Sequence, residues 1–353
     1  MSEHTLIRSG IGNKASLYNI LRCMMGKECK TYYEPFAGAL GVFFSLYNGM
    51  YEKEYINDIS IDLAALYYAL ANNMTRDRTV DGILSIEKPD NRQEAKKQFN
   101  VVSDKLRGKG PLELEQIPED EIVDMAINTY LAYNQSMNCS SRGYSSLKSN
   151  GQYLCETREN IKNAMERLLT NPVVTCRDGL ELLRDGNITD NPYNQLVLDP
   201  SYCGLYRNCR TDYRTDMPGL ESHIRLAESI KDAKAAVVLC GYREQNADIP
   251  TVYDAVLGEQ YKCYKISEQS VSCEVVSKGM RKRKAIEYVW TNREPSKMAK
   301  YYVSLRDCRE YISLEDYWSR INNLIKAGCI PDRQVAEYQK AYQAFYQQSL
   351  HKD

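Results

Sequence analysis

The 353-residue sequence contains no apolar run of about 20 residues, the length that a membrane-spanning helix requires. Its first residues lack a basic segment followed by an apolar stretch, so we expect no secretion signal and a cytoplasmic protein. Only 11 prolines and 19 glycines occur, whereas 43% of the residues are hydrophobic and 26% are charged. This composition excludes a low-complexity chain and favours a folded α/β or α+β protein.

Zinc-binding patterns are also missing from the sequence. None of the 12 cysteines stands in a Cys-x-x-Cys pair, and there are only three histidines. The closest cysteine pairs, Cys23 with Cys29 and Cys203 with Cys209, do not match the spacing of zinc ligands. We therefore expect no metal site, and free, mostly buried thiols of the kind found in a reducing compartment.

The net charge of −1 gives no global argument for nucleic-acid binding, because 46 basic residues are offset by 47 acidic ones. The basic residues are nevertheless clustered. Each cluster alone is typical of a solvated surface, but three of them in a nearly neutral chain indicate local contacts with phosphates. The clusters are Arg92, Lys96, Lys97, Lys105, Arg107 and Lys109; Lys278, Arg281, Lys282, Arg283 and Lys284; and Arg207, Arg210 and Arg214.

The order of the expected elements is that of a doubly wound α/β sheet with a polar, mostly helical block from 75 to 185 inside it. Periodicity predicts strands over 31–34, 54–56, 195–198, 235–239, 261–266 and 286–291. It predicts helices over 15–25, from 41–46, over 61–70 and 220–231, and from 314 onward. Within the block, Pro118 and the acidic residues after it predict the start of a further helix.

The first candidate site is Tyr33-Glu34-Pro35-Phe36-Ala37-Gly38, a strand that runs into a glycine-containing turn ahead of a helix. Such a turn allows a ligand to approach the backbone closely, although ordinary connections also use it. Asp58 comes 20 residues after Gly38, at the end of the next strand. A carboxylate there accepts both hydroxyls of a ribose, so the two features together indicate a nucleoside-containing cofactor.

The second candidate site is Asp199-Pro200-Ser201-Tyr202, which directly follows the apolar strand over 195–198. A carboxylate beside a proline-fixed carbonyl offers two acceptors to one amino group, and the tyrosine offers a ring face to a base. Accepting both hydrogens of an exocyclic amine directs its lone pair toward an electrophilic methyl group, so catalysis is mainly positioning and electrostatics. The alternative is an ordinary turn, because Asp-Pro is a frequent turn pair.

With these motifs in this order, the sequence resembles the Dam-type DNA adenine methyltransferases. The resemblance spans about residues 5 to 295. It implies a Rossmann-like methyltransferase sheet that transfers a methyl group from S-adenosylmethionine to the N6 amine of adenine in duplex DNA. The main matching elements are Gly12-Asn13-Lys14, Glu34-Pro35-Phe36-Ala37-Gly38 with Val42-Phe43-Phe44, Asn57-Asp58-Ile59 and Asp199-Pro200-Ser201-Tyr202; weaker ones are Tyr133 to Asn138 and Arg283 to Trp290.

The motif order resembles the alpha group, in which the cofactor motifs precede an inserted target recognition domain and the Asp-Pro-x-Tyr element follows it. The resemblance thus implies a mostly helical recognition domain inside the sheet, and duplex DNA and a cognate restriction endonuclease as partners. The implied divisions are a cofactor-binding part over 1–74, the recognition domain over 75–185, the catalytic part over 186–300 and a helical extension over 301–353.

The resemblance also implies roles for individual residues. Asp199 and the Pro200 carbonyl grip the target amine, and Tyr202 stacks on the adenine that is extruded from the duplex. Asp58 binds the ribose of the cofactor. The full set of implied cofactor-binding residues is Gly10, Gly12, Lys14, Glu34, Pro35, Phe36, Gly38, Asp58, Ile59 and Asp199. The implied DNA-binding residues are Asn134, Ser136, Asn138 and Arg142.

Three positions depart from the usual pattern of the family. Gly10 stands where an aromatic residue is usual, Leu40 where a second glycine is usual, and Ser201 where the family has a second proline. Ser201 keeps the needed Pro200 carbonyl but restores one φ freedom and one N–H to the loop. Two alternatives to adenine methylation stay open: cytosine N4 methylation, whose target amine is presented alike, and a catalytically silent homologue that binds DNA or the cofactor.

Overall fold

The computed structural model describes a mixed α/β protein with a seven-stranded sheet in the order β3-β2-β1-β4-β5-β7-β6. Its residues fall into two compact units, each described by itself. The first unit holds the described residues of Met1–Asn19 and Glu28–Leu182, and the second those of Ile20–Lys27, Leu183–Arg210 and Met217–Asp353. The described residues are 6–7, 14–87, 89–108, 110, 113–136, 143–145, 161, 164–203, 205, 217, 219–243, 249–270 and 284–349.

The strands of the first unit are parallel. β1 (Thr31–Glu34) pairs with β2 (Lys53–Asn57), which pairs with β3 (Val173–Thr175). Tyr33 is the register partner of Tyr55, and their rings stack with centroids 4.6 Å apart. Because the strands are parallel, their carboxyl ends lie at one edge, where the loops that follow them are brought together.

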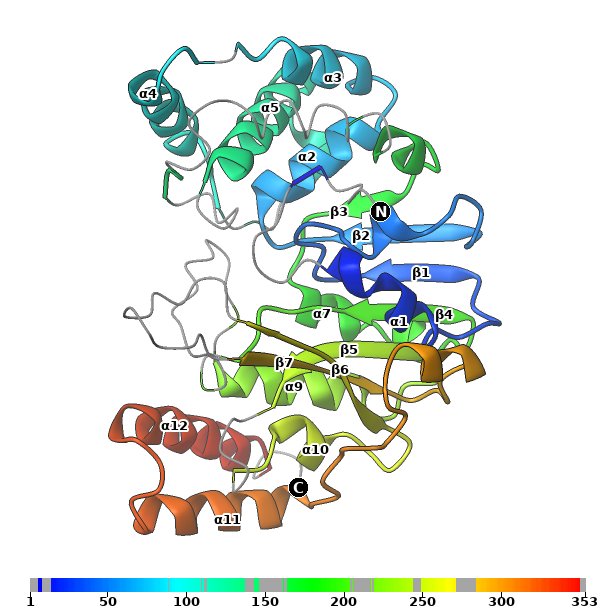
Figure 1. Cartoon of the computed structure of the whole chain (residues 1–353), viewed down its shortest axis with the longest axis vertical. Coiled ribbons are helices and arrows are strands. Elements are labelled where there is room, and N and C mark those ends of the chain that lie inside the picture. The colour runs from blue at the N-terminus through cyan, green and yellow to red at the C-terminus, as the bar shows by residue number, and fades with distance from the viewer. Residues whose placement is uncertain are drawn as a thin grey trace. The chain divides into compact units, whose positions relative to one another are not determined.

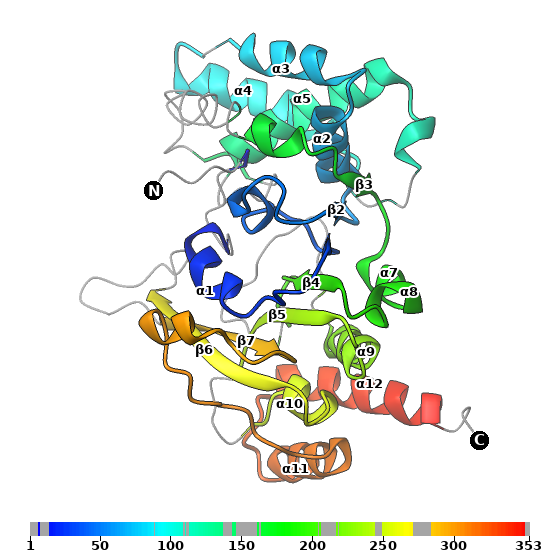
Figure 2. The same ribbon diagram turned by 90° about the vertical axis from the view of Figure 1, so that its right-hand side faces the viewer.

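The helices of the first unit gather around α2 (Ile61–Ala71), as Figures 1 and 2 show. Every residue of α2 except Tyr68 is buried, because α3, α5 and β3 all pack against it. The buried Asp62 carboxylate accepts the Arg107 and Gly108 amides, which explains how a charge is tolerated in this helix. The surrounding helices are α3 (Arg76–Leu84), α4 (Arg92–Ser103) and α5 (Glu119–Gln135), with the short η3 (Leu114–Gln116) before α5.

Two strands of the second unit, β4 and β5, are buried over almost their whole length. β4 (Asn194–Leu198) pairs in parallel with β5 (Ala236–Tyr242), and no residue of β4 is exposed. β7 (Lys284–Thr291) runs antiparallel to both β5 and β6 (Lys262–Ser270). The continuous hydrophobic runs at the end of β4 and along β5 are typical of parallel strands that are covered on both faces. The accompanying helices are α8 (Gly186–Thr189), α9 (Leu220–Ile230) and α10 (Val252–Val256).

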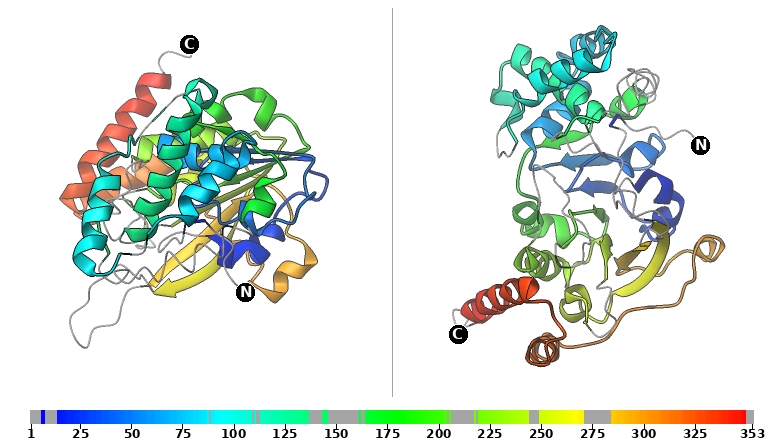
Figure 3. Two further views of the ribbon diagram at one scale, coloured as in Figure 1. Left: turned by 90° about the horizontal axis from the view of Figure 1, so that it is seen from above. Right: turned by 60° about the vertical axis from the view of Figure 1, so that its left-hand side comes forward.

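The C-terminal part adds η7 (Lys297–Tyr301), α11 (Leu314–Lys326) and α12 (Asp332–Ser349), the last two drawn in orange and red in Figure 3. α12 packs on α9, and α11 packs on α10. Arg309, in the segment before α11, donates from its guanidinium to the Asp254, Leu257, Gly258 and Tyr261 carbonyls. It thereby satisfies carbonyls at the end of α10, which lack partners inside the helix.

Two elements differ from those expected from the sequence. The helix expected from 41–46 is only the 3₁₀ turn η2 (Phe43–Ser45). The backbone becomes extended at Leu46, and β2 begins only a few residues later at Lys53. The helix expected over 15–25 is shorter, comprising η1 (Lys14–Leu17) and α1 (Tyr18–Arg22). In addition, β3 lies within the block over 75–185 and was not predicted, since three residues carry too weak a pattern.

Two further features concern cysteines and membranes. All eight cysteines that the structure describes are free, and four of them are buried: Cys176, Cys203, Cys240 and Cys263. Among the described helices, none combines the length and apolar character needed to cross a bilayer.

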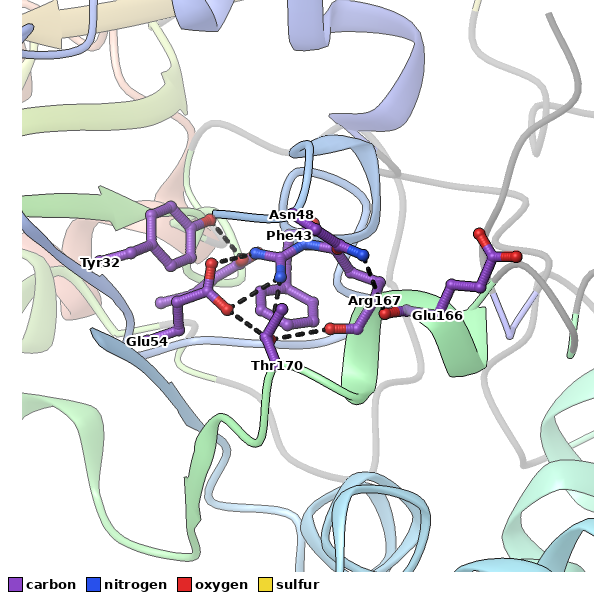
Figure 4. Close-up of polar contacts among 8 residues, drawn as sticks. Tyr32, Phe43, Asn48, Glu54, Glu166, Arg167 and Thr170 are labelled. Atoms are coloured by element: carbon purple, nitrogen blue, oxygen red, sulfur yellow. Dashed lines mark hydrogen bonds and ion pairs between the residues drawn. The ribbon is translucent and has the colours of Figure 1, made fainter. Parts of the chain in front are cut away.

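A buried ion pair fixes β2 to the helical turn over 164–168 of the first unit (Figure 4). Arg167 and Glu54 are 3% and 6% exposed, and the guanidinium contacts both carboxylate oxygens, one at 2.8 Å. Thr170 donates to the same carboxylate at 2.7 Å. The Arg167 Nε donates to the Phe43 carbonyl at 3.1 Å, and the guanidinium lies 4.1 Å from the centre of the Phe43 ring. The network therefore holds η2 and β2 together.

We expect Arg167→Met to lower the free energy of unfolding by about 3 to 5 kcal/mol, because it leaves the Glu54 carboxylate buried without its counter-charge. Arg78→Met is the matched control, since Arg78 pairs with Glu119 and Asp120 at the surface and its removal should cost less than about 1 kcal/mol. Urea unfolding of both variants measures the difference. Equal, small effects would contradict a stabilising role of the buried pair.

Candidate active site

The loop after β1 is held in a fixed conformation by buried hydrogen bonds. Glu34 is 3% exposed and accepts a hydrogen bond from the Tyr32 hydroxyl at 2.6 Å. Gly38 has φ +50°, a left-handed value that favours glycine. Its carbonyl accepts the Tyr67 hydroxyl at 2.5 Å. Burial and the Asp58 charge raise the pKa of Tyr67 well above its usual value, so this hydroxyl remains a donor.

Asp58 connects the loop after β1 to the end of β2. One carboxylate oxygen accepts the Gly38 amide at 2.8 Å, and the other accepts the Ser60 amide at 2.8 Å. Burial raises the pKa of Asp58, while these two amide hydrogen bonds favour the charged form and oppose the rise. A carboxylate has about four lone-pair sites, so each oxygen keeps capacity for one more donor.

Asn57 and Gly179 also shape this loop, and neither was singled out from the sequence. The Asn57 side-chain amide donates to the Pro35 and Arg177 carbonyls at 2.9 Å each, and its oxygen accepts the Arg177 amide and the Thr175 hydroxyl. It therefore ties together the carboxyl ends of β1, β2 and β3. A Cβ on Gly179 would lie 2.6 Å from a Phe36 ring carbon and 2.9 Å from the Pro35 oxygen, so only glycine fits there.

Asp178 is a further acidic residue at this edge that the sequence reasoning missed, because β3 was not predicted. It follows β3, and its carboxylate accepts the Leu180 amide at 2.9 Å at the start of α7 (Gly179–Leu183). The carboxyl ends of β2 and β3 thus each carry an aspartate, Asp58 and Asp178. Both are of the residue type that binds hydroxyl and amino groups of a nucleoside.

The residues of the loop fit a nucleoside-containing cofactor. A Cβ built at Gly38 meets no atom within 4 Å, so the backbone there is open to a ligand. Asp58 has lone pairs left for ribose hydroxyls, and Phe36 is only half-buried. Of the other predicted cofactor residues, Lys14 is 2% exposed, Pro35 is buried and Ile59 is half-buried. Gly10 and Gly12 lie outside the described residues.

Leu40, one of the departures from the family pattern, is compensated by its packing. Its φ is +54°, in the left-handed region where a glycine is usual, and its side chain is fully buried. A non-glycine residue in this conformation costs roughly 1 to 2 kcal/mol. Burying a leucine side chain contributes about 1.5 to 3 kcal/mol, so packing offsets the backbone strain.

The loop over Asp199–Tyr202 lies in the second unit, directly after the carboxyl end of β4. Asp199 is half-buried and Pro200 is buried. Tyr202 donates its hydroxyl hydrogen to Glu287 of β7 at 3.0 Å, and its ring meets the Tyr242 ring edge-on with centroids 4.3 Å apart. Burial, followed by the charges of Asp199 and Glu287, raises the pKa of Tyr202 well above its usual value. The tyrosine is therefore neutral and oriented by the sheet, through a hydrogen bond to Glu287 that was not expected from the sequence.

The predicted DNA-binding residues lie at the end of α5 or outside the described residues. Asn134 is 1% exposed and donates to the Leu6 and Tyr130 carbonyls, and Ser136 is fully buried and donates to the Tyr133 carbonyl at 2.9 Å. Both side chains thus stabilise the end of α5. Asn138 and Arg142 lie outside the described residues.

The α/β fold, with a glycine-bearing loop after β1 and an Asp-Pro-x-Tyr loop after β4, is consistent with the class of S-adenosylmethionine-dependent methyltransferases. The chain belongs to the D12 class N6 adenine-specific DNA methyltransferase family, whose model matches residues 11–270. It is similar to the type II methyltransferase M.CviBI of Paramecium bursaria Chlorella virus NC1A, with 26% identity over 211 residues that cover 59% of this chain and 71% of the relative.

Membership of this family confirms the main expectations from the sequence. The protein is an enzyme that methylates the N6 amine of adenine in DNA and uses S-adenosylmethionine as methyl donor. Of the two possible target bases left open above, the family selects adenine rather than cytosine.

We expect Gly179→Ala and Asp58→Ala each to weaken S-adenosylmethionine binding by about 1 to 3 kcal/mol. The first forces Phe36 and the Pro35 carbonyl out of place, and the second leaves the Gly38 and Ser60 amides without their acceptor. Gly186→Ala is the matched control, because its Cβ would meet only an Asp190 oxygen at 3.4 Å. Calorimetric titration of the folded variants measures the affinities. Unchanged affinity in both would remove this loop from the cofactor site.

Proposed function

We propose that this chain is a site-specific methyltransferase of duplex DNA that extrudes its target adenine, holds it on the Asp199–Tyr202 loop and binds S-adenosylmethionine on the loop after β1. The single observation that carries the proposal is the Asp-Pro-Ser-Tyr loop placed directly after β4, with its tyrosine fixed by Glu287. An extruded base requires such a pocket of acceptors and a ring for stacking.

On the cofactor side, we assign the ribose hydroxyls to Asp58 and close backbone contact to Gly38. The spare lone pairs of Asp58 and the open space at Gly38 support this assignment. Phe36 lines the same site, together with Glu34, Pro35, Ile59 and Lys14. We also assign Asp199 to cofactor binding, as the resemblance to the family implies. S-adenosylmethionine, when bound, supplies an electrophilic methyl group on a sulfonium sulfur.

On the DNA side, Asp199 and the Pro200 carbonyl accept the two hydrogens of the adenine N6 amine. The nitrogen lone pair would then be directed at the methyl group that S-adenosylmethionine would supply, and the methylated amine would release one proton to solvent. Tyr202 holds the base by stacking. These residues contribute position and charge rather than a covalent step.

We propose further that the helical block over 75–185 includes the target recognition domain. Arg92, Lys96 and Lys97 support this, because all three are exposed on α4 while Ala95 and Phe99 on the same helix are buried. One face of α4 is therefore basic and accessible to phosphates. Asn138 and Arg142 remain the candidates for reading bases, and Asn134 and Ser136 the candidates for holding that segment.

The similarity to a type II methyltransferase supports a place in a restriction–modification pair. A cognate endonuclease would then cleave the sequence that this enzyme modifies, but only while that sequence is unmethylated. Methylation-sensitive long-read sequencing of DNA from cells that express the chain reports the modified base and the site together. An endonuclease assay on methylated and unmethylated copies of that site then tests the pairing, and equal cleavage of both copies would contradict it.

We expect Asp199→Ala to abolish methyl transfer while leaving DNA affinity largely intact, because the carboxylate acts on the target nitrogen. Tyr202→Ala should cost about 1 to 3 kcal/mol in transition-state stabilisation because the base no longer stacks on a ring. Transfer of a radiolabelled methyl group to mixed-sequence duplex DNA measures both. Retained activity in a folded Asp199→Ala variant would remove this loop from the chemistry.

We expect simultaneous replacement of Arg92, Lys96 and Lys97 by alanine to weaken DNA binding and to lower the salt slope of the affinity by ~0.9 for each phosphate that the helix no longer neutralises. The matched control removes three exposed charges from α11 and α12, namely Lys326, Arg333 and Lys340. Fluorescence anisotropy at several salt concentrations gives both slopes. If the two triple variants behave alike, α4 presents only a solvated surface.

A further inference from the structure

Ser201, which replaces the family's second proline, is part of a partly buried chain of hydrogen bonds in the second unit. The Ser201 hydroxyl oxygen accepts the Met217 amide at 2.6 Å. The Met217 carbonyl lies 2.9 Å from Nε2 of His223 on α9, and Nδ1 of the same imidazole lies 2.5 Å from the Tyr253 hydroxyl on α10. Four residues that are far apart in the sequence are thus linked in a line that ends at the amine-binding loop.

The chemistry of the end groups fixes the direction of each hydrogen bond. A backbone carbonyl only accepts, so Nε2 of His223 carries the hydrogen and donates it to Met217. In the neutral imidazole, Nδ1 is then an acceptor and takes the hydrogen of the Tyr253 hydroxyl. Burial raises the pKa of Tyr253 well above its usual value, so this hydroxyl stays protonated and remains a donor.

The far end of the chain is anchored in the sheet. His223 is 1% exposed and Tyr253 is 3% exposed. The Tyr253 ring meets the Trp290 ring of β7 edge-on with centroids 5.1 Å apart. A Cβ on Gly241 of β5 would lie 3.2 Å from a Tyr253 ring carbon, which leaves the tyrosine little room to shift. The position of the Tyr253 hydroxyl is therefore set by β5 and β7, and it sets the position of the imidazole in turn.

We propose that His223 is a positioning residue for methyl transfer: through Met217 and the Ser201 hydroxyl it holds the Asp199–Tyr202 loop in its amine-binding conformation. This inference rests on the proposed role of that loop. Ser201 then replaces the rigidity of a second proline with a hydrogen bond to a fixed partner. Without the chain, the extra φ freedom at Ser201 would lower the population of the competent loop.

The test compares His223→Ala and Ser201→Ala with a matched control in the methyl-transfer assay on mixed-sequence duplex DNA. Each variant is expected to lower kcat about tenfold, the effect of one buried hydrogen bond in the transition state, with little change in the KM for S-adenosylmethionine. The control is Tyr261→Phe, which removes a buried tyrosine hydroxyl bonded to the Ile230 carbonyl elsewhere in the same unit. Tyr261→Phe and Tyr253→Phe should both lower the stability of the protein. Only Tyr253→Phe should also lower kcat, because only Tyr253 contacts His223.

Whether the kcat losses at Ser201 and His223 are coupled distinguishes a positioning role of His223 from a general effect on stability. If His223 acts through Ser201, the double variant Ser201→Ala, His223→Ala should be no slower than either single variant, whereas independent effects would multiply to about a hundredfold. His223→Gln, whose amide can donate to Met217 in place of Nε2, should recover much of the rate. Ser201→Pro should transfer faster than Ser201→Ala, because proline restores the rigidity of the loop although it removes the acceptor of the Met217 amide.

The results of these assays distinguish a failure of the proposed function from a failure of the role of His223 alone. No methyl transfer by the parent chain overturns the proposed function itself. An active parent with full kcat in folded His223→Ala overturns only the role of His223. Multiplicative rate losses in the double variant, or an equal kcat loss in Tyr261→Phe, reduce His223 to a structural residue.

Discussion

The loop after β1, where we propose that the cofactor binds, depends on the Asn57 side-chain amide at the end of β2. Four hydrogen bonds from this one group reach the loop after β1 and the end of β3, so the three strand ends cannot move independently. Asp58 then takes the Gly38 amide from a fixed position. A buried amide with all its capacity used is rigid, because any displacement leaves a polar group unsatisfied. The loop is therefore preorganised before a ligand arrives.

The sequence was sufficient to predict the strands that carry the site, because each is an apolar or aromatic run that ends at an acidic residue. β1, β2 and β4 appear close to their expected bounds, whereas β5 (Ala236–Tyr242) has no acidic residue at its end and continues beyond its expected end at 239. The sequence was not sufficient for β3, Gly179 or Asn57, whose importance comes mainly from contacts made across 118 or more residues. A glycine needed for a neighbour's ring, or an amide that joins three strands, leaves no periodic pattern.

Two of the three departures from the family pattern, Leu40 and Ser201, have physical explanations of different kinds, and the third, Gly10, lies outside the described residues. Leu40 accepts a left-handed backbone in exchange for complete burial, so its cost is offset by packing. Ser201 gives up the rigidity of proline and forms a hydrogen bond to Met217. In both cases a local conformational preference is replaced by a tertiary interaction. From the sequence motifs alone, both residues would be expected to weaken the site. In the structure, packing offsets the backbone strain at Leu40, and a hydrogen bond restrains Ser201.

The Arg309 guanidinium ties the C-terminal segment to the rest of the second unit through four hydrogen-bonded carbonyls, so this segment is not an appended tail. Its four backbone acceptors belong to the end of α10 and the approach to β6, and the neighbouring Glu310 amide donates to the buried Asp254 carboxylate. A chain cut after residue 300 would leave these carbonyls, and a carboxylate already bound by Trp290, short of donors in the interior. The sheet of the second unit and the segment after residue 300 thus belong to one folding module, and a stable fragment of this unit must include both.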